Sequence, residues 1–448
     1  MQWRPSSSAH LGLICACAVQ AAAFMLPALV FAQSASAADA PSLAPFAQQL
    51  ADGGVALNSA YVGEFAANPT GGERQGAAYN DEISFGATAD LGKLINLKGG
   101  SLEVMFTNRD GSSLAAAKIN NSISVQEKYG DGQTSQLTFL TYNQTLFGGL
   151  VETRIGRDDI TFHFAFQPGA CLYFQSFAIC NNPSVTLQDV NDGSSYWPEA
   201  VWGGLVKANP TPWLYAKLGV YEDQPTLNPH VNHGFDWSGS HGNGVQIGGE
   251  IGYQTTQPGA VLPDKYALGT IYDLGHYSAP FYSPERQYGR GLIYFQANKT
   301  MFQPVKGAPQ GLYMFGGLYF GTAGDSQKVG YEWQAAALYF GAIPGRPDDN
   351  VGFQITGLHY TKDLLDTLYQ DRLAEGGAEL PSSRMTMAEL NYTVKLTPWA
   401  NVTPNLQYIW NPDGLGALAY PAANLKNAVV LGAQLVIDVG KLLRFSAN

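Results

Sequence analysis

Residues 79–91 read Y-N-D-E-I-S-F-G-A-T-A-D-L and alternate between two kinds of side chain. The odd positions are largely apolar: Tyr79, Asp81, Ile83, Phe85, Ala87, Ala89 and Leu91. The even positions are all small or polar: Asn80, Glu82, Ser84, Gly86, Thr88 and Asp90. A period of two is the repeat of a β-strand, whose successive side chains point to opposite faces of the sheet. The stretch therefore predicts a strand with one apolar face and one polar face.

The same alternation recurs from about residue 55 to the end of the chain. We count sixteen candidate strands, which start near residues 55, 78, 100, 134, 149, 199, 213, 245, 264, 288, 311, 331, 351, 384, 399 and 427. An even number of such strands is typical of a transmembrane antiparallel β-barrel. We expect the polar faces to line a water-filled lumen and the apolar faces to meet lipid.

The connections between the candidate strands differ in length. Those after odd-numbered strands are mostly long, up to about forty residues, whereas those after even-numbered strands are mostly about ten residues or fewer. Outer-membrane barrels show this asymmetry, because their periplasmic turns are short and their extracellular loops are longer. A soluble β-sandwich has no reason to keep it. The pattern predicts an all-β, sixteen-stranded barrel in the bacterial outer membrane.

The composition favours the same class. Charged residues make up 14% of the 448 residues, whereas soluble domains contain roughly 25%. Gly (51), Tyr (24), Phe (22) and Trp (8) are plentiful. No apolar run after residue 31 has the roughly 18 residues that a transmembrane helix needs. The net charge of -11 argues against a nucleic-acid partner, since no basic cluster is present to neutralise phosphates.

The first residues have a different character. Arg4 precedes an apolar stretch, and Ala35-Ser36-Ala37 follows it as an A-x-A cleavage site. The pattern predicts a secretory signal peptide over residues 1–37, with an uncleaved membrane anchor as the alternative. We expect residues 38–54 to form an N-terminal periplasmic segment and residues 55–448 to form the barrel.

Two cysteines remain after the predicted leader, Cys171 and Cys180. An exported protein reaches an oxidising compartment, where an even pair close in sequence is expected to form a disulfide. Two unpaired thiols are the alternative.

Residues 341–350, G-A-I-P-G-R-P-D-D-N, separate two of the candidate strands. The two prolines fix the backbone, the second glycine permits a sharp reversal, and the aspartates can accept backbone N–H groups. The arginine is expected to pair with one of the aspartates. The stretch predicts a stiff periplasmic hairpin whose structural residues are Pro344, Gly345, Arg346, Asp348 and Asp349.

This hairpin resembles the L-x-P-G-R-P-D-D signature of the OprB-type carbohydrate-selective porins. Other blocks agree in the family's order: Tyr61–Asn68 with Gly71-Gly72, Leu396–Trp399, and Pro404–Pro412 with Gly414. The early Gly-Asp-Trp-Gly-Gly motif of the family and its terminal aromatic residue are missing. The resemblance implies a sixteen-stranded outer-membrane barrel that admits glucose and other sugars by diffusion.

In sixteen-stranded porins the third extracellular loop folds into the lumen, and we expect the same of the connection between Arg157 and Pro198. It is rich in aromatic residues: Phe162, Phe164, Phe166, Tyr173, Phe174, Phe177, Tyr196 and Trp197. Sugars can stack their C–H faces on such rings while their hydroxyls bond to charged groups. The alternative role of the rings is to hold the loop against the wall.

Charged residues on the polar strand faces are the candidate pore-lining residues. Alternation places Glu152 and Arg154 inward, because Val151 and Ile155 point to lipid. Their signs are mixed, which suits an uncharged polar solute, whereas ion-selective pores usually carry rings of one sign. A salt-bridge network that only stabilises the barrel is the alternative. The candidates are Glu103, Arg109, Glu152, Arg154, Lys217, Glu250, Glu389, Lys395 and, from the third loop, Trp197.

We therefore predict a porin for passive, sugar-preferring diffusion, with outer-membrane lipid, lipopolysaccharide and the barrel-assembly machinery as partners and no cofactor. A non-selective porin, an envelope binding or adhesion protein, and a barrel hydrolase are the alternatives. A hydrolase needs a Ser or Thr nucleophile beside a His base, and neither His163 nor His359 belongs to such a motif. A metal site built from His230, His233 and His241 is conceivable, but a solvated loop is the simpler interpretation.

Overall fold

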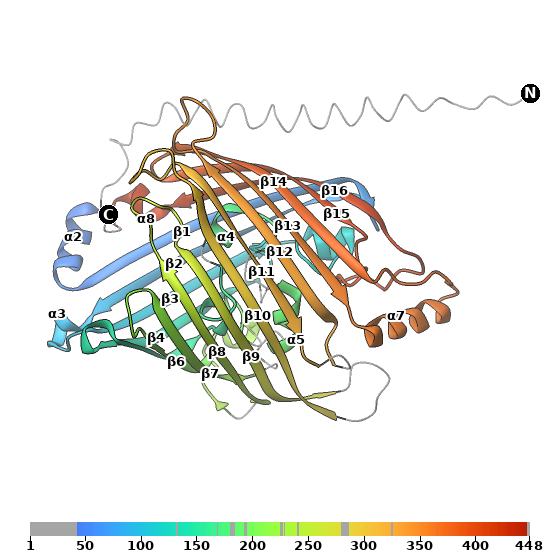
Figure 1. Ribbon diagram of the computed structural model, residues 1–448, viewed down its shortest axis with the longest axis horizontal. Coiled ribbons are helices and arrows are strands. Elements are labelled where there is room, and N and C mark those ends of the chain that lie inside the picture. The colour runs from blue at the N-terminus through green and yellow to red at the C-terminus, as the bar shows by residue number, and fades with distance from the viewer. Residues whose placement is uncertain are drawn as a thin grey trace, which may run out of the picture.

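The computed structural model describes residues 43–130, 133–167, 169–179, 184–191, 195–224, 227, 229–239, 242–278, 286–323 and 326–445. In these ranges sixteen antiparallel strands form a closed barrel, in which sequence neighbours pair and β1 pairs with β16 (Figure 1). The strands are β1 Val55–Gly72, β2 Gly76–Asp90, β3 Gly100–Gly111, β4 Ser135–Leu146, β5 Val151–Asp158, β6 Val201–Ala208, β7 Leu214–Asp223, β8 Gly244–Thr255, β9 Asp264–Ser278, β10 Arg286–Phe302, β11 Gly311–Gly321, β12 Val329–Phe340, β13 Asn350–Tyr360, β14 Arg384–Thr397, β15 Ala400–Trp410 and β16 Lys426–Asp438.

The sixteen predicted strands are confirmed among the described residues, and each begins within two residues of its predicted start. The predicted length of the first connection, between β1 and β2, was wrong. It was expected to be long, but β1 and β2 pair without interruption from Val55↔Ala89 to Asn68↔Gly76. Only residues 73–75 separate these two strands, because β1 continues through two register shifts against β16.

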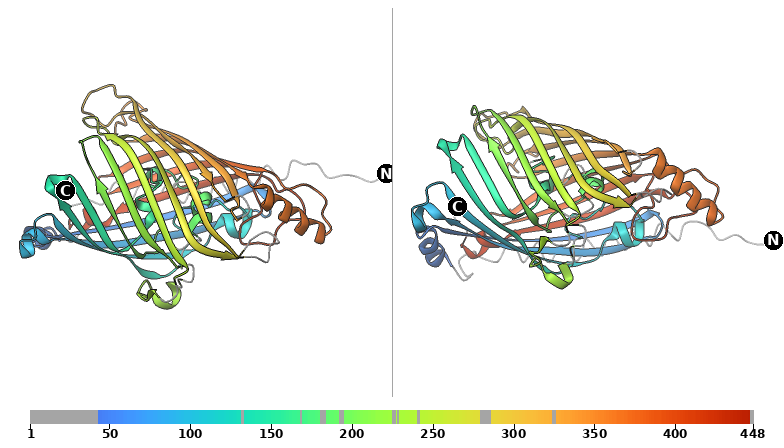
Figure 2. Two further views of the ribbon diagram at one scale, coloured as in Figure 1. Left: turned by 60° about the horizontal axis from the view of Figure 1, so that its bottom comes forward. Right: turned by 90° about the horizontal axis from the view of Figure 1, so that it is seen from below.

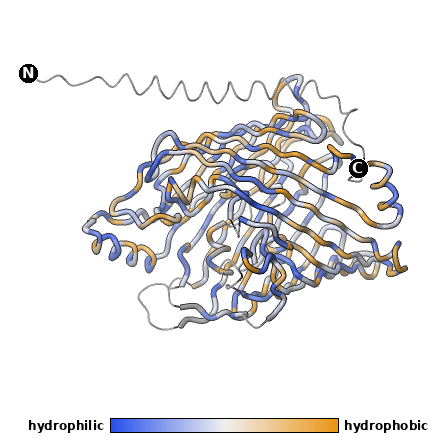
Figure 3. The backbone as a smooth tube through the Cα atoms, turned by 180° about the vertical axis from the view of Figure 1, so that it is seen from behind, coloured by the Kyte–Doolittle hydropathy of each residue, from blue (hydrophilic) through white to orange (hydrophobic). Residues whose placement is uncertain are grey.

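The two faces of each strand differ as the alternation predicted. On β2, Ile83 and Phe85 are 45% and 47% exposed on the outside, whereas Glu82 is 5% exposed on the lumen side. Along the strands hydrophilic and hydrophobic positions follow one another closely (Figure 3). The outer surface is therefore an apolar band that suits lipid, and the polar groups face inward.

Helices lie at the two rims, in the interior and, in the case of α6 (Pro229–Asn232), against the outside of the wall (Figure 2). Those at the rim of the short turns are α2 Ala44–Asp52, α3 Leu91–Ile95 and α8 Val439–Leu443, and α7 Lys362–Ala374 lies at the opposite rim (Figures 1 and 2). The others are α4 Ala170–Tyr173, α5 Ser184–Asn191 and α6 Pro229–Asn232, with short helical turns at Ala115–Ile119, Phe147–Gly149 and Ile160–Phe162. No helix in the described part of the chain is long and apolar enough to cross a membrane.

Both ends of the predicted domains can be compared with these elements. The signal peptide predicted for residues 1–37 lies outside the described residues. The helix α2 occupies the segment before β1, and the backbone N–H of Leu43 donates to Leu443 O at 3.0 Å. The wall ends with β16 at Asp438, and the described residues 439–445 after it contain the helix α8.

Candidate solute path

Residues 159–200 connect β5 to β6, and we call their described part, 159–167, 169–179, 184–191 and 195–200, the inserted connection, because it lies inside the barrel (Figure 1). Polar side chains of the opposite wall hold their backbone. The carboxylate of Glu389 on β14 accepts hydrogen bonds from the N–H groups of Gln175, at 3.0 Å, and Ser176, at 2.8 Å. Gln296 on β10 donates to Ala165 O at 2.7 Å. A segment tied to two strands of the far wall cannot swing freely in the lumen.

Apolar contacts hold the same segment. Ile160, Phe164 and Leu187 pack with Tyr294 and other lumen-facing residues of β9–β11 in one buried cluster. A second cluster joins the inserted connection and residues 112–134 to lumen-facing residues of β13–β16, among them Leu358, Met385, Met387, Ile409 and Val430. Apolar packing therefore fills much of the interior along β9–β16, and a separate group of charged residues lies along β2–β9.

One end of that charged wall is a cluster around Glu82. Arg109 donates through Nε to Glu82 Oε2 at 2.7 Å, and Trp197 donates through Nε1 to the same oxygen at 2.9 Å. The ammonium of Lys128 lies 3.6 Å from Glu82 and 3.1 Å from Glu127. This arrangement joins β2, β3, the inserted connection and residues 112–134 through charge-assisted bonds.

Burial and neighbouring charges shift the pKa values of Glu127 and Lys128, the two residues of this cluster that lie between β3 and β4. Burial raises the pKa of Glu127 to about 7, although Lys128 acts against the rise. Burial alone would lower the pKa of Lys128, but the carboxylates of Glu127 and Glu82 raise it above its usual range. Lys128 therefore stays charged, whereas Glu127 titrates near neutral pH.

Further along the wall, Arg154 on β5 organises a second group. Its Nη1 lies 2.6 Å from Glu103 Oε2 and donates to Asn143 Oδ1 at 3.1 Å. Its Nε lies 3.0 Å from Asp158 Oδ2, an oxygen that also lies 2.8 Å from His163 Nε2. The side chain of Asp158 is fully buried, so it pairs with Arg154 from the side away from the lumen, and 15% of the Arg154 side chain stays exposed.

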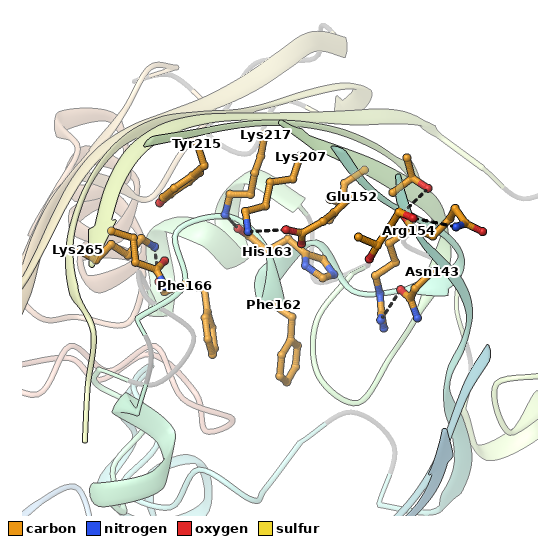
Figure 4. A pocket seen from close by; sticks show the side chains of 15 residues that line it. Asn143, Glu152, Arg154, Phe162, His163, Phe166, Lys207, Tyr215, Lys217 and Lys265 are labelled. Atoms are coloured by element: carbon orange, nitrogen blue, oxygen red, sulfur yellow. Dashed lines mark hydrogen bonds and ion pairs between the residues drawn. The ribbon is translucent and has the colours of Figure 1, made fainter. Parts of the chain in front are cut away.

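Next to Arg154 a cavity of about 350 Å³ opens between the wall and the inserted connection. Figure 4 shows Glu152, Lys207 and Lys217 hanging from the strands toward His163, while Phe162 and Phe166 extend side by side from the inserted connection. The cavity is lined by Asn143, Gln144, Thr145, Glu152, Thr153, Arg154, Phe162, His163, Phe166, Leu205, Lys207, Tyr215, Lys217, Gln254 and Lys265. The cavity thus places charged groups and aromatic rings on one surface of the lumen.

The ammonium groups in this cavity are each paired. Lys207 Nζ lies 3.3 Å from Glu152 Oε1, and both side chains stay partly exposed, at 31% and 45%. Lys217 Nζ lies 2.8 Å and Lys265 Nζ 3.6 Å from Glu250 Oε1, whose side chain is fully buried. Lys217 also donates to His163 O, and Lys265 to Phe166 O at 3.0 Å. Lys217 and Lys265 therefore join the wall to the inserted connection.

Four aromatic rings form a contiguous group at the edge of the passage. The ring centroid of Phe162 lies 5.5 Å from Phe139, 5.6 Å from Phe166 and 5.2 Å from Trp197. Phe139 and Trp197 are 5.3 Å apart, and the guanidinium of Arg154 lies 5.3 Å from the Phe139 ring. We call Phe139, Phe162, Phe166 and Trp197 the aromatic group.

The predicted site residues fall into three sets. Glu103, Glu152, Arg154 and Lys217 lie along this one wall; Arg109 is on it too but is buried against Glu82, and Trp197 reaches Glu82 from the inserted connection. Glu250 and Glu389 face inward as expected, but both are buried and their oxygens are taken by protein donors, so neither lines the pore. Tyr215 and Tyr294 each donate to Glu250 at 2.7 Å. Lys395 lines a separate cavity of about 290 Å³ with Tyr173 and Asp348.

Several residues of the path were missing from the prediction: Glu82, Phe139, Asp158, His163, Lys207 and Lys265. Alternation already placed Glu82 on the polar face of β2, and the same rule applied to β6 finds Lys207 on the face of Leu205. Asp158 is the last residue of its strand, where the boundary between strand and loop was uncertain in the sequence. Nothing in the sequence indicates that His163 turns back to Asp158.

The hairpin at 341–349 holds its shape through Asp349. Arg346 donates to both carboxylate oxygens of Asp349, at 2.7 and 2.8 Å, and does not pair with Asp348. Asp349 also accepts from the Tyr392 hydroxyl and from the Lys395 N–H, at 2.9 Å. Burial would raise the pKa of Asp349, but the bonds from Arg346 and Tyr392 hold it below its usual range. The aspartate thereby fastens the hairpin to β14.

Two further sequence expectations involve residues at the edge of the described ranges. Cys171 is disulfide-bonded, and its expected partner Cys180 lies outside the described residues. The described residues contain no group of three His, Cys, Asp or Glu side chains placed to hold a metal ion. Of the three histidines considered for a metal, His233 Nδ1 lies 2.8 Å from Ser135 O, and His241 lies outside the described residues.

A closed sixteen-stranded barrel with an apolar exterior, an inserted connection and a charged interior passage defines an outer-membrane porin. A model of the OprB family of carbohydrate-selective porins matches residues 74–438. The chain belongs to this family, and it is a sugar-preferring outer-membrane porin.

Individual relatives agree with the family match. The chain is 28% identical to Porin B of Pseudomonas aeruginosa over 419 residues, which cover 86% of this chain and 88% of that protein. The high-pH structure of Pseudomonas putida OprB superposes with a TM-score of 0.78 at 25% identity, covering 89% of this chain and 99% of that chain. The low-pH structure of the same protein gives a TM-score of 0.52 at 22% identity, with 87% and 94% covered.

Proposed function

We propose that glucose and related sugars cross this porin passively between the charged wall of β2–β9 and the aromatic group. The observation that carries the proposal is the cavity that Arg154, Lys207, Glu152, Phe162 and Phe166 line together (Figure 4). Apolar C–H faces of a sugar can rest on the rings while its hydroxyls exchange water for charged partners. Charges of both signs favour an uncharged polar solute over an ion.

The test is swelling of liposomes that carry the purified porin, with glucose, a disaccharide and a zwitterionic amino acid as solutes. We expect glucose to enter faster than the amino acid. A hydrogen bond contributes about 0.5–1.5 kcal/mol, so Arg154→Ala should lower the glucose-to-amino-acid ratio roughly 2- to 10-fold. The matched control is Lys395→Ala, which removes a cation that lines the other cavity.

Each other result has a meaning. Equal rates for glucose and the amino acid in the unaltered protein would leave a non-selective porin. An absence of swelling from a correctly folded barrel would remove the channel function, and binding without flux would favour an envelope binding protein. An equal loss of selectivity in Lys395→Ala and Arg154→Ala would show that the path does not follow the β2–β9 wall.

The same proposal covers catalysis and partners. We infer a channel without hydrolase activity, because His163 bonds to Asp158 and His359 stacks on Tyr331, and in the described part of the chain neither ring is bonded to a Ser or Thr hydroxyl that could act as the nucleophile. Hydrolysis of an ester substrate by the purified barrel would contradict this.

The apolar outer band implies outer-membrane lipid and lipopolysaccharide as surroundings, and the closed barrel implies assembly by the barrel-assembly machinery.

A further inference from the structure

The barrel wall is short along the barrel axis at β5 and β6. Each of these strands has 8 residues, compared with 15 in β2 and 12 in β3. At about 3.4 Å per residue and a tilt of about 40°, eight residues rise roughly 20 Å, less than the roughly 25 Å of an apolar membrane band. The pairing of β4 with β5 extends only to Leu140↔Arg157, although β4 begins at Ser135. The wall therefore has a notch beside the first residues of β4.

Residues 229–239, which we call the strap, cross this notch on the outside of the barrel (Figure 2). The strap belongs to the connection between β7 and β8, yet its backbone pairs with β4. Leu137 N donates to His233 O at 2.9 Å, and His233 Nδ1 lies 2.8 Å from Ser135 O. An unpaired strand edge is a costly exposure of polar groups, and the strap satisfies part of it.

The strap lies very close to the strand. Gly234 has φ +77, and a Cβ at this position would stand 2.3 Å from Leu137 O and 3.0 Å from Leu137 N. Only glycine allows such an approach without displacing one of the two backbones. The docking of the strap on β4 is therefore specified in the sequence.

Aromatic contacts extend the strap over the outer wall. The ring of Phe235 lies 6.5 Å from Phe106 of β3, and that of Trp237 lies 6.4 Å from Trp202 of β6. Trp202 Nε1 donates to Trp237 O at 3.0 Å. The guanidinium of Arg157, which is 1% exposed in total, lies 5.8 Å from the Trp202 ring. The strap thus helps to cover a buried cation that the low wall alone would bring close to lipid.

Three large apolar side chains are exposed on the strap, beside the exposed His230, His233 and Ser238. Val231 is 75% exposed, Phe235 54% and Trp237 46%. These side chains adjoin the exposed faces of Phe106 and Trp202, which belong to the lipid-facing band of the barrel. We propose that the strap is a lateral seal: it closes the notch between β4 and β6 and lies in the outer leaflet with Val231, Phe235 and Trp237 against lipid acyl chains. The inference does not depend on which solute the pore prefers.

Spin labelling tests the position of the strap. Val231→Cys carries a nitroxide in a protein reconstituted into phosphatidylcholine vesicles, and collision rates are measured with oxygen, which concentrates in lipid, and with a water-soluble nickel chelate. Leu380→Cys is the control, because Leu380 is 69% exposed and lies in another long connection at the same rim. We expect an oxygen-to-nickel ratio several-fold higher at position 231. Equal ratios, or protection of position 231 from both reagents by a second copy, would overturn the proposal.

A second variant tests the docking itself. Gly234→Ala should release the strap, so that the label at position 231 becomes accessible to nickel while the barrel still runs as a folded species in unheated electrophoresis. Gly376→Ala is the matched control, since Gly376 has φ +81 but a Cβ there would meet nothing within 4 Å. A folded Gly234→Ala barrel whose label stays in lipid would refute the role of the β4 contact.

Discussion

The carboxylate of Glu389 offers the sharpest test of how the inserted connection is held. It accepts from Gln175 N at 3.0 Å, Ser176 N at 2.8 Å and Asn391 Nδ2 at 2.9 Å, and it is fully buried. Glu389→Ala leaves two buried backbone N–H groups without acceptors. Each such group costs about 1–3 kcal/mol, so the variant should weaken local docking by roughly 2–6 kcal/mol.

Hydrogen–deuterium exchange of the reconstituted barrel measures this loss directly. Local opening governs amide exchange, and 2 kcal/mol corresponds to roughly a 30-fold change in the open population. We expect peptides that contain Gln175 and Ser176 to exchange at least about 30-fold faster in Glu389→Ala. Glu389→Gln keeps one carbonyl oxygen and should show a smaller rise.

The control is Glu152→Ala, which removes another inward carboxylate. Glu152 bonds to Lys207 and Asn209 and not to the backbone of the inserted connection. Exchange at Gln175 and Ser176 should be unchanged in this variant. If Glu389→Ala folds as a barrel and these amides remain as protected as before, the carboxylate does not anchor the inserted connection and the reasoning fails.

Three other predictions follow from the path and the hairpin. Phe166→Leu should slow glucose entry roughly 2- to 10-fold in liposome swelling, because an aromatic contact contributes about 0.5–1.5 kcal/mol. The potassium chloride conductance should change little. Unchanged glucose entry would count against a role of the aromatic group in sugar passage. Lys207→Met should move the zero-current potential in a salt gradient toward cations, since Lys207 is a partly exposed cation of the cavity, and an unmoved potential would place the ion path elsewhere. The lowered pKa of Asp349 means that its stabilising contribution is complete above the ordinary carboxyl pKa of about 4 and is lost as pH falls toward the pKa of the folded state. The urea midpoint of unfolding should therefore fall less between pH 7 and pH 3 in Asp349→Asn than in the unaltered protein. An equal fall of the midpoint in both proteins would contradict this.

The strands were predictable because their period of two is a local property. The exception is instructive: Pro69 and the glycines at 71 and 72 look like a turn, yet β1 passes through them. The register shifts of β1 against β16 fall between Ala67 and Thr70 and between Thr70 and Gly72. Bulges of this kind let a strand absorb a residue that cannot donate to the ladder. A bulge depends on the partner strand, which alternation within one segment does not reveal.

The site was predictable only as far as alternation reaches. Glu152 and Glu389 are indistinguishable in the sequence, since both are carboxylates on polar strand faces. In the barrel Glu152 is 45% exposed in the cavity, whereas Glu389 lies under the inserted connection. Which face of the lumen the connection covers depends on long-range packing through residues such as Phe164 and Leu187. Inward residues under the inserted connection anchor it, and inward residues on the uncovered face are the candidate pore-lining residues.

This separation also explains how a charged passage can favour an uncharged solute. The carboxylates of Asp158 and Glu250 are fully buried and neutralise the cations from behind, whereas Arg154, Lys207 and Lys217 keep 15%, 31% and 13% of their side chains exposed. On the proposed path a sugar would therefore meet N–H donors whose charge is already balanced, beside the partly exposed carboxylates of Glu103 and Glu152. Such contacts are strong enough to replace water and too weak to hold the solute, which is the balance that flux through a pore requires.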